Sequence, residues 1–363
     1  MEIEKQRIVE ALYDVADPTT GKDLIAARMV ENLTVEGLNV NFNLVLPTLN
    51  HPQKQDLIFA CVAAVQSAYP QAEVNVHVVA KTAAAQAGAP GFSKVKNIIA
   101  VASGKGGVGK STVAVNLALG LQQLGAKTGL IDADLYGPSI PTMLGLQGQR
   151  PQVQDVGGQP KIIPLMAYGI PVMSIGFIIE PEQAVVLRGP RLAAIIKQFF
   201  NDVLWPELDY LVVDLPPGTG DIQLTLVQTV PVTGAVMVTT PQEVALADAV
   251  KAMNMFLLPS VNVPILGVVE NMAWFTPEDL PDRKYYLFGQ GGGKALVLAS
   301  ESMLLGQVPL VQGIREGGDQ GKPAVLDQQA LTGQAFRKIA ENTIRQVAVR
   351  NEMLEPTRIV GVQ

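Results

Sequence analysis

The sequence predicts an α/β protein: a doubly wound, mostly parallel sheet preceded by a small α+β domain. Three observations lead to this prediction. After residue 96, short apolar runs alternate with segments of helical spacing. A glycine-rich segment, GKGGVGKST at residues 104–112, separates the first apolar run from the first helical segment. Upstream, residues 81–95 are rich in Ala and Gly and contain one Pro, which is typical of a linker.

The chain has 363 residues, of which 48% are hydrophobic, and this size suggests two domains with a large buried core. The linker sets the expected division. We expect a small domain at residues 1–80, the linker at 81–95, a large domain at 96–350 and a C-terminal tail at 351–363.

The composition also limits location and partners. The N-terminal sequence MEIEKQRIVE is charged and lacks the apolar core of a signal peptide. No run approaches the roughly 18–20 apolar residues of a membrane span. The net charge is −6 without a basic block, which argues against nucleic-acid binding. We therefore expect a cytoplasmic protein with neither a membrane nor a nucleic-acid partner.

In the small domain, Glu36-Gly37 separates two alternating segments, as the turn of a hairpin does. The segment EVNVHVVA further along also alternates like a strand. No group of residues here suggests catalysis. The expected elements are a helix at 4–14, strands at 28–34 and 38–47, a helix at 51–68 and a strand at 73–80.

In the large domain the strands are apolar on both faces, as strands of a buried parallel sheet are. The carboxyl ends of such strands carry the ligand site. The expected strands are 97–102, 128–132, 208–213, 234–239 and 263–269. The expected helices are 110–124, 193–204, 221–229, 243–257 and 328–350, the last a covering helix with Leu331, Phe336, Ile339, Ile344 and Val347 at helical spacing.

The glycine-rich segment matches the pattern G-x-x-x-x-G-K-[ST] in a strand–loop–helix context. Glycines let the backbone aim its N–H groups at phosphate oxygens, and the helix N-terminus adds a positive end. Lys110 supplies a charge for the outer phosphates, and Ser111 supplies a hydroxyl for Mg²⁺. The residues predicted to bind ATP are Gly104, Lys105, Gly106, Gly107, Val108, Gly109, Lys110, Ser111 and Thr112.

The same glycines also spell G-x-G-x-x-G, the dinucleotide fingerprint, and Asp132 lies near the position of its ribose-binding acid. A dinucleotide fold packs its first helical turn closely on the strand, where a lysine is awkward. Lys110-Ser111 therefore favours a nucleoside triphosphate. A dinucleotide-binding oxidoreductase is the alternative, and tight NADH binding with no effect of Mg-ATP would support it.

Carboxylates follow two of the expected strands. Asp214 ends the apolar run from Asp209, a Walker B pattern that places a carboxylate near Mg²⁺. Asp132 and Asp134 follow the apolar run TGLI and project similarly along the chain. Such residues can face the loop and its metal ion, or they can solvate a strand end or cap a helix.

The form GKGGVGKST resembles the deviant Walker A class of ATPases, which includes the MinD and ParA families and nitrogenase iron protein. The resemblance implies that Lys105 reaches across a dimer interface to the partner's phosphates, where a cation stabilises the transferring group. A solvated loop charge is the alternative for Lys105. The resemblance to this ATPase class also implies that Asp134 positions the attacking water and that Asp132 lies in the outer shell of Mg²⁺. The expected catalytic residues are Lys105, Lys110 and Asp134, and the expected Mg²⁺ residues are Ser111, Asp132 and Asp214.

Further site residues are expected from similar resemblances. LPPGTGD at 215–221 resembles a switch II loop in which Gly218 offers its N–H to the γ-phosphate, while Asp221 caps the next helix. Asn271 follows a strand where an asparagine recognises adenine in the resembling families, a turn role being the alternative. Arg315 is assigned to the base pocket. A solvated surface role is assigned to Arg188 and Arg191, and a flexible turn before a helix to Gly291-Gly292-Gly293.

Longer motifs narrow the class. IDADLYGPSIP, LRGPR, VVDLPPGTGD, TTPQEVALAD and VVENMAWF together resemble the Mrp/ApbC family over residues 96–350. The N-terminal domain resembles the small iron–sulfur-assembly domain that often precedes such ATPases. The resemblance implies a Mg²⁺-dependent ATPase that acts as a homodimer and carries iron–sulfur clusters. Its implied partners are apoprotein recipients and iron–sulfur assembly proteins.

The cysteine content departs from that family. Many relatives carry C-x-x-C after the ENM motif, whereas this chain reads AWFTPEDLPDRKYYLFGQGGG there and has one cysteine in all, Cys61. A homodimer thus offers two thiols where a [4Fe–4S] cluster takes four, which excludes a cluster held by four cysteines of one homodimer. Cys61 has Leu57 and Val65 at i±4, which predicts a buried, inert thiol. His51 and His77 are too few and too scattered for a metal site, so the iron–sulfur ligands stay unknown.

Two functional alternatives remain beside the cluster carrier. One is an ATPase switch that helps assembly without holding a cluster. The other is a spatial-organisation ATPase like MinD or ParA, which needs a basic amphipathic terminal helix or a basic patch. The tail EPTRIVGVQ, with Pro356 and Gly361, opposes such a helix, and the composition opposes such a patch.

Overall fold

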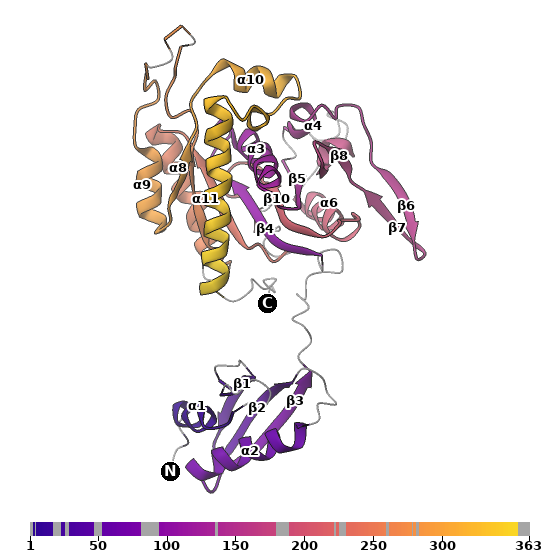
Figure 1. Ribbon diagram of the computed structural model, residues 1–363, viewed down its shortest axis with the longest axis vertical. Helices are drawn as coiled ribbons and strands as arrows, with labels where there is room; N and C mark the ends of the chain where they lie inside the picture. Colours follow the sequence, from indigo (N-terminus) through magenta and orange to yellow (C-terminus); the bar gives the residue numbers. More distant parts are fainter. Residues whose placement is uncertain are drawn as a thin grey trace. The chain divides into compact units, whose positions relative to one another are not determined.

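The computed structural model of the chain divides into two compact units, Met1–Ala85 and Gln86–Gln363 (Figure 1). The residues that the structure describes are 3, 5–16, 23–25, 29–46, 53–80, 94–134, 137–178, 189–220, 223–224, 230–258, 261–277, 279–280 and 283–354. Each unit is considered by itself.

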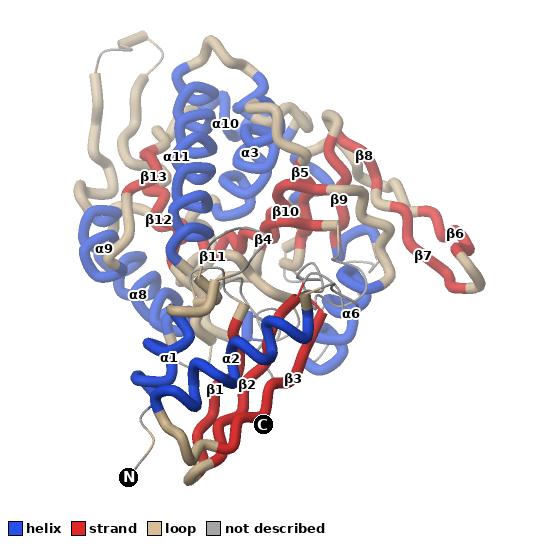
Figure 2. The backbone as a smooth tube through the Cα atoms, turned by 60° about the horizontal axis from the view of Figure 1, so that its bottom comes forward, coloured by secondary structure: helices blue, strands red, loops and turns tan. Residues whose placement is uncertain are grey.

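The small unit is a three-stranded sheet with two helices. Strands β1 and β2 are antiparallel, β3 adds to β2 in parallel, and Gly37 turns the hairpin with φ +63°. Helices α1 and α2 contact each other and the sheet (Figure 2). The expected elements all occur, with ends moved by up to three residues. They are α1 (Lys5–Tyr13), β1 (Val30–Glu36), β2 (Asn39–Leu46), α2 (Lys54–Ala68) and β3 (Glu73–Ala80).

The large unit is built on an eight-stranded sheet in the order β13-β12-β11-β4-β10-β5-β9-β8. All neighbouring strands are parallel except β8 and β9. The prediction of a mostly parallel sheet is therefore confirmed. The strands are β4 (Val95–Ala102), β5 (Thr128–Asp132), β8 (Leu165–Ala167), β9 (Ile170–Ser174), β10 (Leu208–Asp214), β11 (Gly234–Thr239), β12 (Ile265–Glu270) and β13 (Leu304–Gln307).

Helices cover both faces of this sheet, as a doubly wound fold requires (Figure 1). One face packs against α3 and α11, and the other against α6, α8 and α9, so the central strands bury residues in two separate cores. The helices are α3 (Lys110–Gln123), α4 (Ile140–Met143), α6 (Gly189–Asn201), α8 (Glu243–Leu257), α9 (Gly292–Ser300), α10 (Gln312–Asp319) and α11 (Leu331–Met353), with 3₁₀ turns η1 (Ile175–Phe177) and η2 (Ala324–Leu326).

Several elements were not expected from the sequence. Strands β6 (Gln152–Val156) and β7 (Gln159–Ile163) form a separate hairpin, and β8, β9, β13, α4 and α10 lie in stretches that showed no clear period. Proline at position 171 interrupts the strand pattern of β9. Of the expected helix 221–229 only residues 223–224 are described, and the linker up to residue 93 and the tail from 355 lie outside the described residues. Within the part of the chain that is described, no helix is both long and apolar enough to cross a membrane.

Candidate functional site

The phosphate loop joins the end of β4 to α3 at the carboxyl edge of the sheet (Figure 1). Gly107 and Gly109 have φ +80°, a left-handed conformation that glycine adopts at little cost. Gly109 is the N-cap of α3, and since it has no side chain it makes no capping hydrogen bond to this helix. The first N–H groups of α3 are therefore suited to donate hydrogen bonds to a phosphate oxygen.

Two glycines of the loop also permit close packing. A Cβ on Gly104 would lie 2.0 Å from the backbone carbon of Asp248, because the loop rests on α8. A Cβ on Gly109 would lie 2.1 Å from the amide nitrogen of Asn271. A side chain at either position would push the loop away from its supports.

The predicted lysine and two of the predicted carboxylates meet in this site. Lys110 is buried, and its Nζ lies 2.6 Å from Oδ1 of Asp214 and 3.3 Å from Oδ2 of Asp134. The Lys110 ammonium also lies 3.3 Å from the Ser111 hydroxyl. Burial raises the pKa of Asp214, while the charge and hydrogen bond of Lys110 act in the opposite direction. The ammonium thus compensates negative charge at a site where all three side chains are largely buried.

Asp132 is fully buried beside this pair. Its Oδ1 accepts a hydrogen bond from the backbone N–H of Asp134 at 3.1 Å, and its Oδ2 accepts one from the Ser174 hydroxyl at 2.9 Å. Burial, followed by the nearby charge of Asp214, raises the pKa of Asp132 to about 8. Ser174, at the end of β9, was missed by the sequence analysis. Its only sequence signal is a polar residue closing an apolar run.

The donor set suits Mg²⁺ held together with a nucleotide. Oδ2 of buried Asp214 accepts no hydrogen bond from the described residues at normal distance, although the Ser111 hydroxyl is close enough to lower the pKa of this carboxyl. An uncompensated buried oxygen is a natural ligand for a cation or its bound water. No group of three or more His, Cys, Asp or Glu in the described ranges could hold a metal by itself. Phosphate oxygens would therefore have to complete the coordination.

Lys105 lies on the α8 side of the loop. Its Nζ is 3.5 Å from Oε1 of Gln242, the residue that precedes α8, and its backbone carbonyl accepts the Ser103 hydroxyl at 3.0 Å. The side chain is partly exposed. Its contact with phosphates bound by a second copy stays a prediction.

Gly218, in the loop after β10, is near the phosphate loop. It has φ +95°, and its N–H donates to the carbonyl of Ser103 at 2.9 Å. The N–H that was expected to bind the γ-phosphate is therefore already used, but on an acceptor belonging to the phosphate loop. Asp221 and Arg188 lie outside the described residues, and the Arg191 side chain is not described.

Asn271 is placed as a support of the loop. Its Nδ2 donates to the carbonyl of Val108 at 2.9 Å, and the residue is 5% exposed. Recognition of adenine by Asn271 stays a prediction.

Arg315 is on α10 and pairs with Glu316 at 3.0 Å and Asp319 at 3.2 Å on the surface. Its role in a base pocket also stays a prediction.

Glu270 explains the three glycines at the start of α9. Its Oε2 accepts the N–H of Gly293 at 2.6 Å, and its Oε1 accepts the side chain of Gln307 at 2.6 Å. A Cβ on Gly292 would lie 2.8 Å from the carbonyl oxygen of Pro241. The expected turn before a helix is correct for Gly291 only, because Gly291 is the N-cap of α9 and Gly292 and Gly293 form its first turn. A carboxylate of the chain itself accepts a hydrogen bond at this N-terminus.

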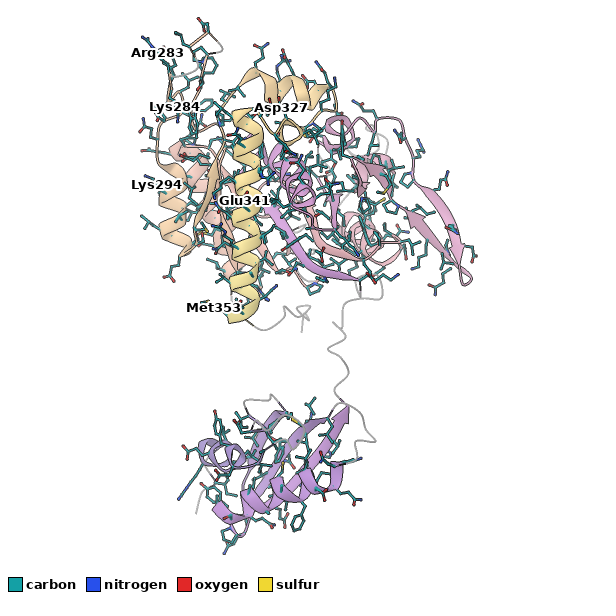
Figure 3. All side chains as sticks on the ribbon, in the orientation of Figure 1. Arg283, Lys284, Lys294, Asp327, Glu341 and Met353 are labelled. Atoms are coloured by element: carbon teal, nitrogen blue, oxygen red, sulfur yellow. The ribbon has the colours of Figure 1, made fainter. Side chains whose placement is uncertain are left out.

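The segment that lacks C-x-x-C forms an aromatic arm after β12. Backbone hydrogen bonds join Phe275 and Tyr285, and the Lys284 ammonium lies 4.0 Å from the centre of the Trp274 ring. Arg283 and Lys284 extend from this arm (Figure 3). No described residue of the arm is a thiol, so it presents rings and cations instead of sulfur ligands.

Cys61 is fully buried in the core of the small unit. Desolvation raises the pKa of its thiol to about 12, so the reactive thiolate is scarce at neutral pH. The predicted burial of this thiol is confirmed, and its lack of reactivity stays a prediction that the raised pKa supports. His77 is exposed on β3, and His51 lies outside the described residues.

Family comparisons agree with this site. The model of the NUBPL iron-transfer P-loop NTPases matches residues 94–344, and a model of iron–sulfur cluster assembly proteins matches residues 5–78. An iron–sulfur cluster carrier protein of Synechocystis is 47% identical over 346 residues, which cover 94% of this chain and 97% of the relative. The carrier protein of Deinococcus radiodurans is 44% identical over 346 residues, covering 94% and 95%.

Solved structures share the fold of the large unit. A nucleotide-binding protein from Archaeoglobus fulgidus in complex with ADP has a TM-score of 0.56 and 38% identity, covering 64% of this chain and 89% of its own. The septum site-determining protein MinD of Pyrococcus horikoshii, complexed with Mg-ADP, has a TM-score of 0.52 and 25% identity, covering 70% and 98%. Both relatives hold an adenine nucleotide.

Proposed function

The chain belongs to the NUBPL-type family of iron-transfer P-loop NTPases, the iron–sulfur cluster carriers, and from this premise we propose that it hydrolyses ATP as a homodimer and delivers clusters to apoproteins. The observation that carries the proposal is the pairing of buried Lys110 with Asp214 and Asp134 at an uncapped helix N-terminus. A buried cation next to free N–H groups is a receptor for a polyphosphate.

Binding of ATP exchanges partners around Lys110. The phosphate tail accepts hydrogen bonds from the loop and the first turn of α3, and Lys110 turns from Asp214 towards the outer phosphates. Ser111 and Asp214 are the residues proposed to hold Mg²⁺, with Asp132 supporting its bound water. When bound, Mg²⁺ neutralises part of the phosphate charge.

Hydrolysis then needs a positioned water and further positive charge. We assign the water to Asp134, which lies beside Lys110 and is held through its own N–H by Asp132. We assign the extra charge to Lys105 of a second copy, because a cation delivered in trans acts when charge spreads over the transferring group. The proposed dimer thus completes each site.

The cluster is the cargo of this proposal, and its ligands come largely from outside the chain. Two Cys61 residues per homodimer are half the usual four, and both are buried. Thiols of a partner protein, thiols of a small molecule or ligands other than cysteine would therefore have to complete its coordination. The burial of Cys61 also favours a second candidate, an ATPase switch that assists assembly without holding a cluster.

The first test is of nucleotide binding and turnover. Wild-type protein should bind Mg-ATP in calorimetry and hydrolyse it, whereas Lys110→Ala should abolish turnover. Lys127→Ala, which removes an exposed lysine of the same unit, is the matched control and should turn over normally. Absence of any affinity of the wild type for Mg-bound adenine nucleotides would overturn the proposal.

The second test separates the two candidates. Wild type and Cys61→Ser are reconstituted anaerobically with iron and sulfide, and iron and acid-labile sulfide are measured per dimer with and without a small thiol. Transfer to an apoprotein is then assayed. Cluster binding that depends on the added thiol and survives Cys61→Ser supports the carrier. No bound cluster and no transfer would leave only the ATPase switch.

A further inference from the structure

The loop after β10 is fastened to β4 and the phosphate loop by its backbone. The N–H of Leu215 donates to Val101 at 3.0 Å, and the N–H of Gly218 donates to Ser103 at 2.9 Å. Val101 is on β4, and Ser103 follows the end of β4 at the start of the phosphate loop. The acceptor that the Gly218 N–H can reach therefore depends on how this loop is held.

Gln223 holds the same loop from the other side. Its Nε2 donates to the carbonyls of Pro216 and Gly218, both at 2.8 Å, and the residue is 1% exposed. Since a carbonyl only accepts, the amide nitrogen must face these two groups. Its Oε1 is buried and has no hydrogen-bond partner among the described residues. The side chain therefore serves mainly as a double donor.

These two bonds orient the peptide group that lies between them. The Gly218 N–H belongs to the peptide joining Pro217 to Gly218, and Gln223 fixes the carbonyl groups on either side of it. The ring of Pro217 restricts φ at 217. Gly218 has φ +95°, which glycine tolerates but other residues rarely adopt. Little freedom is left for the intervening N–H.

A γ-phosphate offers this N–H a stronger acceptor than the one it has. Hydrogen bonds to a charged oxygen are stronger than those to a neutral carbonyl. If the Gly218 N–H donated to phosphate, the carbonyl of Ser103 would lose this hydrogen bond. The hydroxyl of the same Ser103 donates to the backbone carbonyl of Lys105, so the exchange takes place next to Lys105. The gain exists only if the N–H is already aimed correctly.

We propose that Gln223 is a positioning residue for the γ-phosphate: by holding the carbonyls of Pro216 and Gly218 it aims the Gly218 N–H and makes the site distinguish ATP from ADP. This inference rests on the proposed nucleotide site. It assigns the distinction between the two nucleotides to a side chain that touches neither of them.

The test measures the affinity of the full-length protein for Mg-ATPγS and Mg-ADP by calorimetry. Gln223→Met keeps the length of the side chain and removes its donors. It should weaken ATPγS binding by roughly 10- to 100-fold, the worth of a hydrogen bond to a charged group, and leave ADP binding unchanged. Gln223→Glu keeps the shape and retains at most one donor, on a protonated carboxyl, so it should weaken ATPγS binding in the same direction.

The matched control is Gln123→Met, because Gln123 also donates from Nε2 to one backbone carbonyl, that of Val325, and also has a buried Oε1 without a partner among the described residues. It should keep the wild-type preference. Thermal unfolding shows whether each variant is folded. An unchanged preference in folded Gln223→Met or Gln223→Glu, or equal weakening for both nucleotides, would overturn the inference alone. Absence of binding by wild type would instead remove the proposed function beneath it.

Discussion

At the scale of single residues, the site depends on which charges are buried and what faces them. Lys110 is enclosed with carboxylates, whereas Lys105 lies partly exposed against Gln242. Two lysines five positions apart are therefore suited to different tasks. Lys110 is enclosed by the carboxylates of its own copy, and Lys105 is the lysine that we propose acts on a second copy.

We expect Lys105→Ala to slow ATP turnover by on the order of 10³-fold, by analogy with an arginine finger, and to weaken ATP binding far less. The reason is that its charge matters most in the transition state. Single-turnover hydrolysis and calorimetry measure the two quantities. Lys251→Ala removes an exposed lysine of α8 and serves as the control. Full turnover by Lys105→Ala would exclude a catalytic role for this lysine.

A second prediction at this scale concerns Asp132, whose pKa burial raises to about 8. In the unfolded chain it ionises near pH 4, so between about pH 4 and 8 the folded state binds the extra proton. Its contribution to stability is complete below that range and is lost as pH rises through about 8. The free energy of unfolding should fall by at most about 1.4 kcal/mol per pH unit within it.

Asp132→Asn should flatten this dependence, measured by denaturant unfolding from pH 6 to 9 with a chelator present. Asp209→Asn is the comparison, because the hydrogen bond from Lys96 lowers the pKa of Asp209 and keeps it ionised throughout. The Asp209 variant should therefore retain the wild-type slope. Equal slopes in wild type and Asp132→Asn would show that Asp132 is not the titrating group.

At the scale of elements, the phosphate loop is held by two neighbours, α8 through Gly104 and the end of β12 through Asn271. Much of this could be predicted from the sequence, because a glycine pattern, a strand and a helix specify a phosphate loop locally. The supports could not be predicted, because Asn271 and Asp248 approach the loop from distant parts of the chain.

The same limit explains why Ser174 and Gln223 were missed, since their roles follow from pairings between strands and loops rather than from a motif. The short strands β8 and β13 were missed because three or four residues show no period.

Asn271→Ala should weaken ATP and GTP binding to a similar extent, by about tenfold, because it removes a buried hydrogen bond that holds the loop. Calorimetry with both nucleotides measures this. A larger loss for ATP than for GTP would instead assign Asn271 to recognition of adenine.

Gly104→Ala should abolish nucleotide binding, because its Cβ would collide with the backbone of α8 and displace the loop. Gly313→Ala, where a Cβ meets no atom within 4 Å, should bind as wild type does. Unimpaired binding by folded Gly104→Ala would show that the loop can move off α8 without losing the phosphate.

At the scale of the whole molecule, the proposal requires two copies for one reaction. Mixing Lys105→Ala with Lys110→Ala tests this directly, because the first retains a nucleotide pocket and the second retains the lysine to be lent. Each variant alone should be nearly inactive. The mixture should recover about a quarter of wild-type turnover if the copies pair at random and each mixed dimer completes one site. A mixture as inactive as its components would argue for a lysine that acts within its own copy.

The internal ion pairs of Lys110 have a consequence for selectivity. Lys110 is already paired with Asp134 and Asp214, so we expect it to attract inorganic phosphate only weakly. Binding of phosphate to Lys110 would leave these two buried carboxylates without their cation. A magnesium–polyphosphate complex carries both negative phosphate groups and a cation. Its phosphates can pair with the Lys110 ammonium while its magnesium ion compensates the two carboxylates. We therefore expect inorganic phosphate to bind at the proposed site more weakly than a magnesium–nucleotide complex does.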